Sequence, residues 1–171
     1  MMSGPVPVLR RHLYSSTALG LAFAVLGSSA AADSLPNGGQ TVSGSVVIGT
    51  SGSTMTVTQG SEKAIVNWNG FSVGQGNSVN FVQPGTSSAI LNRVTGNATS
   101  AIAGSITGNG QVYLINPNGI AITPTGSVKV GGGFVASTLD VSNEDFLKGQ
   151  YRFNGNGASA SVSNEGVITV G

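Results

Sequence analysis

The sequence predicts an all-β protein, and within that class a parallel β-helix, from three observations. Gly makes up 27 of the 171 residues, and only 8% of the residues are charged, against about 7% Gly and about 25% charged residues in typical soluble domains. Short segments rich in Val, Ile and Thr recur between Gly, Asn, Pro or Ser, and no window shows a helical period. Apolar and Gly positions also agree when the chain is shifted so that Ile90 meets Val112 and then Phe134. The repeat has few identities, so a β-sandwich and a barrel remain alternatives.

The first 32 residues have the pattern of a cleavable signal peptide. Arg10 and Arg11 supply a positive region, an apolar run follows at 18–26, and small residues occupy 29–32. The apolar run is too short to cross a bilayer as a helix. We therefore expect cleavage between Ala32 and Asp33, passage through the general export machinery and a mature domain at 33–171. An uncleaved N-terminal anchor is the alternative.

Residues 33–171 carry few groups suited to catalysis. They contain five basic and six acidic side chains, which gives a net charge of −1, and they contain neither His nor Cys. Nucleic-acid binding is disfavoured because phosphate neutralisation needs clustered Lys and Arg. Without Cys there is no disulfide framework or thiolate metal site, and without His the commonest acid–base group is missing. We expect a protein that is not an enzyme and uses no cofactor or metal.

The expected strands are short, and they lie at 42–48, 55–58, 64–68, 78–82, 89–91, 111–115, 120–122, 127–130, 134–136 and 167–170. A coil of about 22 residues accommodates three such strands and three bends. Stacked coils place Val, Ile, Leu and Phe inward in columns and Ser, Thr and Asn outward. Because an open coil end is prone to aggregation, we expect residues 41–57 to cap the N-terminal end.

The stretch Asn116-Pro117-Asn118-Gly119 predicts a type I turn between two strands. Asn is favoured at the first position because its side chain bonds a backbone N–H two residues on. Pro at the second position has φ already near −65°, and Gly at the fourth position accepts positive φ. A rigid corner of a β-helix is a sufficient explanation for this stretch alone.

Longer stretches make the chain similar to a known family, the two-partner secretion domain of filamentous-haemagglutinin-type exoproteins (the haemagglutination activity domain). The resemblance runs from about residue 60 to the end. It includes "AIVNWNGFSVGQGNSVNFVQP", "AILNRVTGNATSAIAGSITGNGQVYLINPNGIAI", "GSVKVGGGFVASTLDVSNEDFLKGQYRFNGNG" and "VSNEGVITV". The chain departs from the family pattern after the corner, where residues 121–124 are Ala-Ile-Thr-Pro.

The resemblance implies a right-handed parallel β-helix that serves as an export signal. The partner it implies is an outer-membrane barrel transporter with periplasmic POTRA modules in a Gram-negative bacterium. The exoprotein would pass unfolded through the periplasm, begin folding at this domain on the cell surface, and remain there or be released. Because the family's domain usually precedes a long repetitive region, we expect a copy truncated at its C-terminus.

The resemblance also points to residues thought to support folding and export. Asn116, Pro117, Asn118, Gly119 and Ile120 match the family's best-known motif, and Asn92, Arg93, Val94 and Gly96 match a second stretch. The implied product is a monomeric, adhesin-like protein that meets a host or neighbouring cell. Cytolysins and contact-dependent toxins share this domain, so the effector activity is left open.

Several residues allow competing interpretations. Asp140, Glu144 and Asp145 suggest either a calcium site or a solvated loop, and Arg93 either pairs with a carboxylate or braces carbonyl groups. Trp68, Tyr113 and Tyr151 fit a carbohydrate platform or, better, core filling. A free-standing β-helical surface or polysaccharide-binding module is the alternative function. A polysaccharide-degrading enzyme is less favoured because its carboxylates would be clustered.

Overall fold

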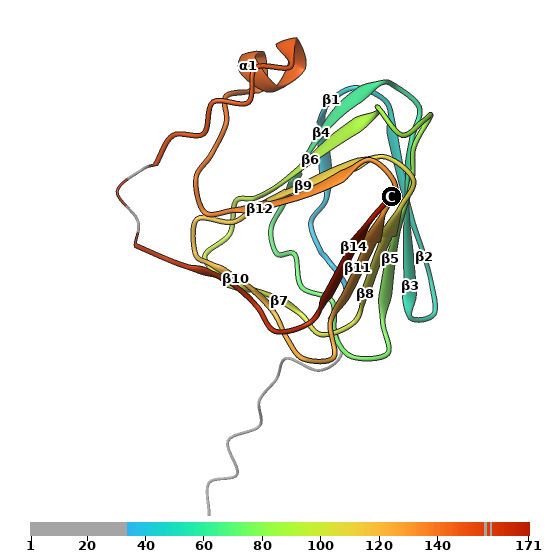
Figure 1. The fold of residues 1–171 in the computed structure, drawn as a ribbon. Coiled ribbons are helices and arrows are strands. Elements are labelled where there is room, and N and C mark those ends of the chain that lie inside the picture. Colours follow the sequence, from blue (N-terminus) through green and yellow to red (C-terminus); the bar gives the residue numbers. More distant parts are fainter. Residues whose placement is uncertain (1–33, 156, 158) are drawn as a thin grey trace, which may run out of the picture.

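The structure is a computed structural model that describes residues 34–155, 157 and 159–171. The predicted signal peptide, with its cleavage point between Ala32 and Asp33, lies outside the described residues. The described chain forms three β-sheets around one apolar interior, and a short helix lies outside them (Figure 1).

The three sheets are the faces of a solenoid. The five-stranded sheet contains β1 (Gln40–Ser43), β4 (Lys63–Trp68), β6 (Ala89–Val94), β9 (Gln111–Ile115) and β12 (Gly133–Ser137). The three-stranded sheet contains β7 (Ser100–Ile102), β10 (Ile120–Ile122) and β13 (Val162–Asn164). The six-stranded sheet contains β2 (Val46–Ser51), β3 (Thr54–Gln59), β5 (Ser78–Val82), β8 (Ser105–Gly108), β11 (Ser127–Val130) and β14 (Val167–Val170).

The chain winds through the three sheets in a fixed order. It passes from the five-stranded to the three-stranded and then to the six-stranded sheet in β6–β7–β8, β9–β10–β11 and β12–β13–β14. An earlier turn runs from β4 past a bridge between Val73 and Ile102 to β5, which makes four turns. Strands of successive turns pair in parallel. The predicted parallel β-helix is therefore confirmed, and the sandwich and barrel alternatives are excluded.

The predicted repeat is confirmed in two of the three sheets. Ile90 pairs with Val112 and Val112 pairs with Phe134, the shift seen in the sequence. In the three-stranded sheet, however, Ser100 pairs with Ile120, so the spacing is two residues shorter. The turn before β10 is shorter than the loop before β7. The loop before β11 is longer than the loop before β8, which restores the spacing in the six-stranded sheet. This compensation explains why the repeat is weak in the sequence.

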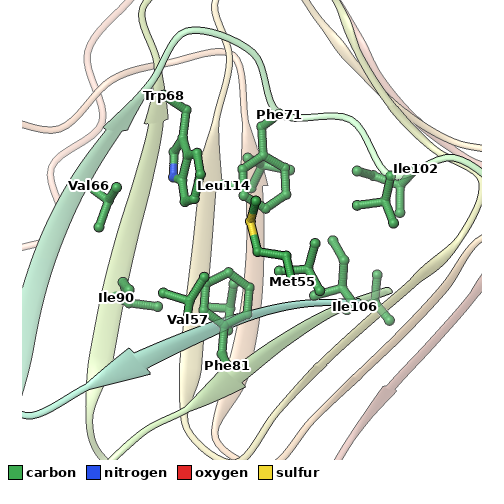
Figure 2. Close-up of a cluster of buried hydrophobic side chains, with 14 of the residues drawn as sticks. Met55, Val57, Val66, Trp68, Phe71, Phe81, Ile90, Ile102, Ile106 and Leu114 are labelled. Carbon is green, nitrogen blue, oxygen red and sulfur yellow. The ribbon is translucent and has the colours of Figure 1, made fainter. Parts of the chain in front are cut away.

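The interior of the solenoid is a continuous apolar core (Figure 2). Trp68 and Phe71 meet edge to face with ring centroids 5.4 Å apart. The other large, fully buried side chains shown there include Phe81, Ile90, Ile102, Ile106 and Leu114. Each such side chain contributes about 1.5–3 kcal/mol through its removal from water. The chain has few charged residues to form ion pairs, so its stability comes mainly from this apolar core.

Two antiparallel strands cap the N-terminal end. β1 pairs with β4 and β2 pairs with β3, both antiparallel. The prediction of one strand at 42–48 is wrong because Gly44, at φ 81°, breaks it into β1 and β2. The predicted cap at 41–57 also extends too far, because β3 already pairs in parallel with β5. The cap is β1 and β2.

The helix α1 (Asn143–Lys148) contradicts both the expectation of no helix and the expectation of a solvated loop at Glu144 and Asp145. Six residues are too few to show a helical period. Its ends carry recognisable signals, because the Ser142 side chain accepts from the Asp145 N–H and Gly149 has φ 74°. Among the described residues, no helix is long and apolar enough to cross a bilayer.

Candidate functional site

The predicted corner forms the turn between β9 and β10. The Gly119 N–H donates to the Asn116 carbonyl over 3.1 Å, which closes the turn. The Asn118 N–H donates to the Asn116 side-chain oxygen over 2.9 Å. Gly119 has φ 110°, and no other residue type among those described has positive φ. These contacts are those of the predicted type I turn, and they leave little conformational freedom at the corner.

The Asn116 side chain joins two turns of the solenoid. It is fully buried, with 0% of its surface exposed. Its Nδ2 donates to the Ala98 carbonyl over 2.9 Å and to the Ser100 hydroxyl over 2.8 Å. Its oxygen receives both the N–H and the side-chain amide of Asn118. Every polar atom of this side chain is therefore used inside the fold, as burial requires.

Asn118 links the corner to the second predicted motif. Its Nδ2 donates to the Gly96 carbonyl over 2.8 Å. A Cβ atom on Gly96 would lie 2.1 Å from the Asn69 carbonyl oxygen, so a side chain does not fit there. The structure thus brings the two motifs together as one stacked corner, which we call the asparagine corner (Asn69, Gly96, Asn116, Asn118).

The other predicted site residues with apolar or amide side chains face the core. Ile120 and Val94 are 1% and 2% exposed, and both belong to the apolar core. Pro117 occupies the second position of the turn. Asn92 is fully buried, accepts from the Trp68 indole N–H over 3.0 Å and donates to the Tyr113 carbonyl over 3.2 Å. The side chains of Ile120, Val94 and Asn92 are therefore not accessible to a partner of the folded domain, whereas Pro117 is half-buried.

Arg93 points to the outside of the five-stranded sheet. There it both pairs with a carboxylate and binds a backbone carbonyl, the two alternatives that the sequence left open. Its Nε donates to the Asp140 carboxylate over 2.9 Å, and its Nη2 donates to the Val141 carbonyl over 2.7 Å. Its Nη1 donates to the Asn143 side chain over 2.9 Å. Arg93 thereby binds residues 138–155, which we call the helical excursion and which carry α1, to β6.

The helical excursion lies outside the five-stranded sheet (Figure 1). It covers a second apolar cluster on that outer face. Phe146 of α1 is fully buried and meets Tyr113 edge to face at 5.3 Å. Lys63 donates to the carbonyls of Phe146 and Leu147 over 3.1 and 3.0 Å, where the helix end leaves acceptors free. Sequence reasoning missed this cluster, although Ser142 and Gly149 marked the ends of a helix.

Two alternative sites from the sequence are not supported. The Asp140 carboxylate pairs with Arg93 and Glu144 pairs with Lys148, and no cluster of three metal-binding side chains occurs among the described residues. Trp68 and Tyr113 are only 1% and 7% exposed, so they fill the two apolar clusters and do not form a carbohydrate platform.

Two shallow grooves lie on the surface of the described residues, and neither of them is lined by an acid, a base or a cation. One, of about 320 Å³, lies beside the corner and is lined by Thr99, 118–121, 159–161 and Ser163. The other, of about 330 Å³, is lined by 75–78, 103–105, Thr125 and Ser127. Their amide, hydroxyl and backbone groups offer hydrogen bonds but no group of the kind that general acid–base catalysis uses.

Comparison with known proteins shows the family and the fold of this chain. Residues 32–171 match the family described as TPS secretion domain. The solved HMW1 secretion domain from Haemophilus influenzae superimposes with a TM-score of 0.73 at 37% identity, over 79% of this chain and 36% of that one. Two heme/hemopexin-binding proteins of Haemophilus influenzae, one from strain Rd, are 42% and 38% identical over 66% and 77% of this chain. The chain spans only 12% and 14% of the length of those two relatives.

Proposed function

Because the chain belongs to the family of two-partner secretion (TPS) domains, we propose that an outer-membrane transporter with POTRA modules recognises it and that β-helix folding of an exoprotein begins on it at the cell surface. Membership of the family indicates two-partner secretion of an exoprotein by a Gram-negative bacterium. Recognition by the transporter and nucleation of folding are the steps that we propose for this domain.

The difference between the two ends of the solenoid is the observation that carries the proposal. β1 and β2 close the N-terminal end with antiparallel pairing. At the other end β12, β13 and β14 are edge strands, and Val162, Val167 and Val170 are 43–61% exposed. A further coil of an emerging chain can therefore pair in parallel with these three strands, and each coil needs only the coil before it. Such an end acts as a template for folding.

Recognition by the transporter is proposed to precede closure of the asparagine corner. Asn116 is fully buried in the folded domain, where its Nδ2 bonds to the preceding turn and its side-chain oxygen bonds to Asn118 in the same corner. Before folding, the same segments offer unpaired backbone groups that can extend a POTRA sheet by strand addition. The low charge of the chain favours passage through a narrow pore. The corner then contributes to export by making folding outside the membrane favourable.

The effector activity is proposed to belong to other parts of a longer exoprotein. An adhesin-like product is proposed from the family resemblance, and its host or cell-surface receptor would contact other parts of a longer chain. The names of the heme/hemopexin-binding relatives describe those proteins, of which the matched region is a small fraction.

Co-expression with a candidate transporter tests the proposal. We expect the chain in the medium only when the transporter is present, and we expect Asn116→Ala to lower its amount. Asn97→Ala is the matched control because Asn97 is exposed in the neighbouring loop. Export without the transporter would overturn the proposal. Crosslinks from the POTRA modules to the folded domain through side chains alone would overturn the strand-addition step.

A further inference from the structure

Tyr113 and Tyr151 stack on each other outside the five-stranded sheet. Their ring centroids lie 5.1 Å apart, and the ring planes are inclined by 27°. Tyr113 belongs to β9, whereas Tyr151 follows α1 in the helical excursion. The sequence contains three tyrosines, and Tyr14 lies outside the described residues. The two described tyrosines are the two that stack on each other. The stack joins two segments that are far apart in the sequence.

Among the described residues, the Tyr151 phenol is the exposed oxidisable group, and the buried Tyr113 phenol stacks on it. The sequence contains no Cys. Met55 and Trp68 are 6% and 1% exposed and lie inside the solenoid, whereas Tyr151 is 41% exposed. Thioether, thiol, indole and phenol groups are the side chains that oxidants attack most readily, and attack follows exposure. An oxidant in solution therefore meets Tyr151 first, with Tyr113 stacked behind it.

We propose that Tyr113 and Tyr151 form an oxidative cross-linking site, at which a peroxidase using hydrogen peroxide creates a dityrosine bond. Each phenol loses one electron and one proton to give a phenoxyl radical. The two radicals couple through a carbon–carbon bond between ring positions ortho to the hydroxyls. The hydrogens on those carbons are then lost, and the phenol oxygens are protonated again. Overall the protein gives up two electrons and two protons, and one peroxide molecule becomes two water molecules.

The stack favours coupling within one molecule over coupling between molecules. Stacking keeps the two radicals adjacent, so their effective concentration far exceeds that of a second protein molecule. The new bond would close a loop of 38 residues between positions 113 and 151. It would fix the helical excursion to β9 in addition to the contacts of Arg93. Restricting the unfolded chain in this way is expected to raise Tm on the order of 10 °C.

Peroxidase treatment of the purified chain tests this site. We expect dityrosine fluorescence in the band of monomer mass, and we expect peptide mapping to link Tyr113 to Tyr151. Tyr151→Phe and Tyr113→Phe each keep the ring and should lower the monomer-band fluorescence to that of untreated protein. The same treatment in urea should also lower it, because the stack is lost.

Three results would overturn the proposal. The first is dityrosine confined to covalent dimers, and the second is linked peptides that contain Tyr14. The third is an unchanged monomer signal in urea or in Tyr151→Phe. Circular dichroism of both Phe variants establishes that they are folded, so that a lost signal reports the missing phenol.

Discussion

The guanidinium of Arg93 and the carboxylate of Asp140 are 2.9 Å apart although 47 residues separate them in sequence. Arg93 is largely buried, with 14% of its side chain exposed, whereas Asp140 is 49% exposed. A pair with one half-exposed partner contributes little through charge alone. The further bonds of Arg93 to Val141 and Asn143 make it the link between β6 and the helical excursion.

Replacing Arg93 should loosen the helical excursion. Arg93→Ala removes bonds to three residues of the helical excursion and leaves the Val141 carbonyl without its charged donor, so we expect a loss of about 1.5–3 kcal/mol in the free energy of unfolding. Arg93→Lys keeps the charge but not the forked geometry, and it should restore only part of the loss. Urea unfolding and limited proteolysis within 138–155 measure both effects. Arg152→Ala, at an exposed position of the same segment, is the control. Equal proteolysis of Arg93→Ala and wild type would contradict this role.

The coil architecture was predictable from the sequence, whereas the helical excursion was not. The shift that aligns Ile90, Val112 and Phe134 reflects stacking of adjacent coils, which is a local, periodic requirement. The corner was predictable because Pro117 fixes its own φ and Gly119 accepts the positive φ of the turn, so the local sequence is sufficient. The partners of Arg93 depend instead on where a segment 47 residues away lies, and no periodicity encodes that placement. The helix was missed because its six residues bury only Phe146.

Removing the Asn116 side chain should destabilise the asparagine corner. Asn116→Ala leaves the Ala98 carbonyl and the Asn118 N–H without partners, and such groups cost about 1–3 kcal/mol each when they stay buried. Asn116→Asp keeps the acceptor but turns an oxygen toward the Ala98 carbonyl, so it should not restore stability. Thermal unfolding compares the Tm of the three proteins, and we expect Asn116→Asp and Asn116→Ala both to unfold below wild type. Wild-type stability in Asn116→Asp would show that the Nδ2 bonds contribute nothing.

Glycine substitutions separate steric from conformational causes. Gly96→Ala places a Cβ 2.1 Å from the Asn69 carbonyl oxygen, so the backbone must move, and we expect the largest loss of stability there. Gly119→Ala meets more space but keeps φ at 110°, which costs about 1–2 kcal/mol. Gly85 has no atom within 4 Å of an added Cβ and no positive φ, so Gly85→Ala should change little. Urea midpoints for the three variants give the comparison. A Gly85→Ala loss as large as that of Gly96→Ala would refute the steric argument.

Alkaline pH should weaken the packing of the helical excursion through Tyr113. Burial, and then the neighbouring Tyr151 phenol, raise the pKa of Tyr113 above its ordinary value of 10.0. Above pH 10.0 the unfolded chain loses this proton while the folded chain keeps it, so the free energy of unfolding falls as pH rises. Below the ordinary pKa the contribution is complete. Tyr113→Phe removes the ionisable group but keeps the ring against Phe146 and Tyr151. Urea unfolding at several pH values should therefore show a shallower alkaline decline in Tyr113→Phe than in wild type, and identical declines would mean that another group is responsible.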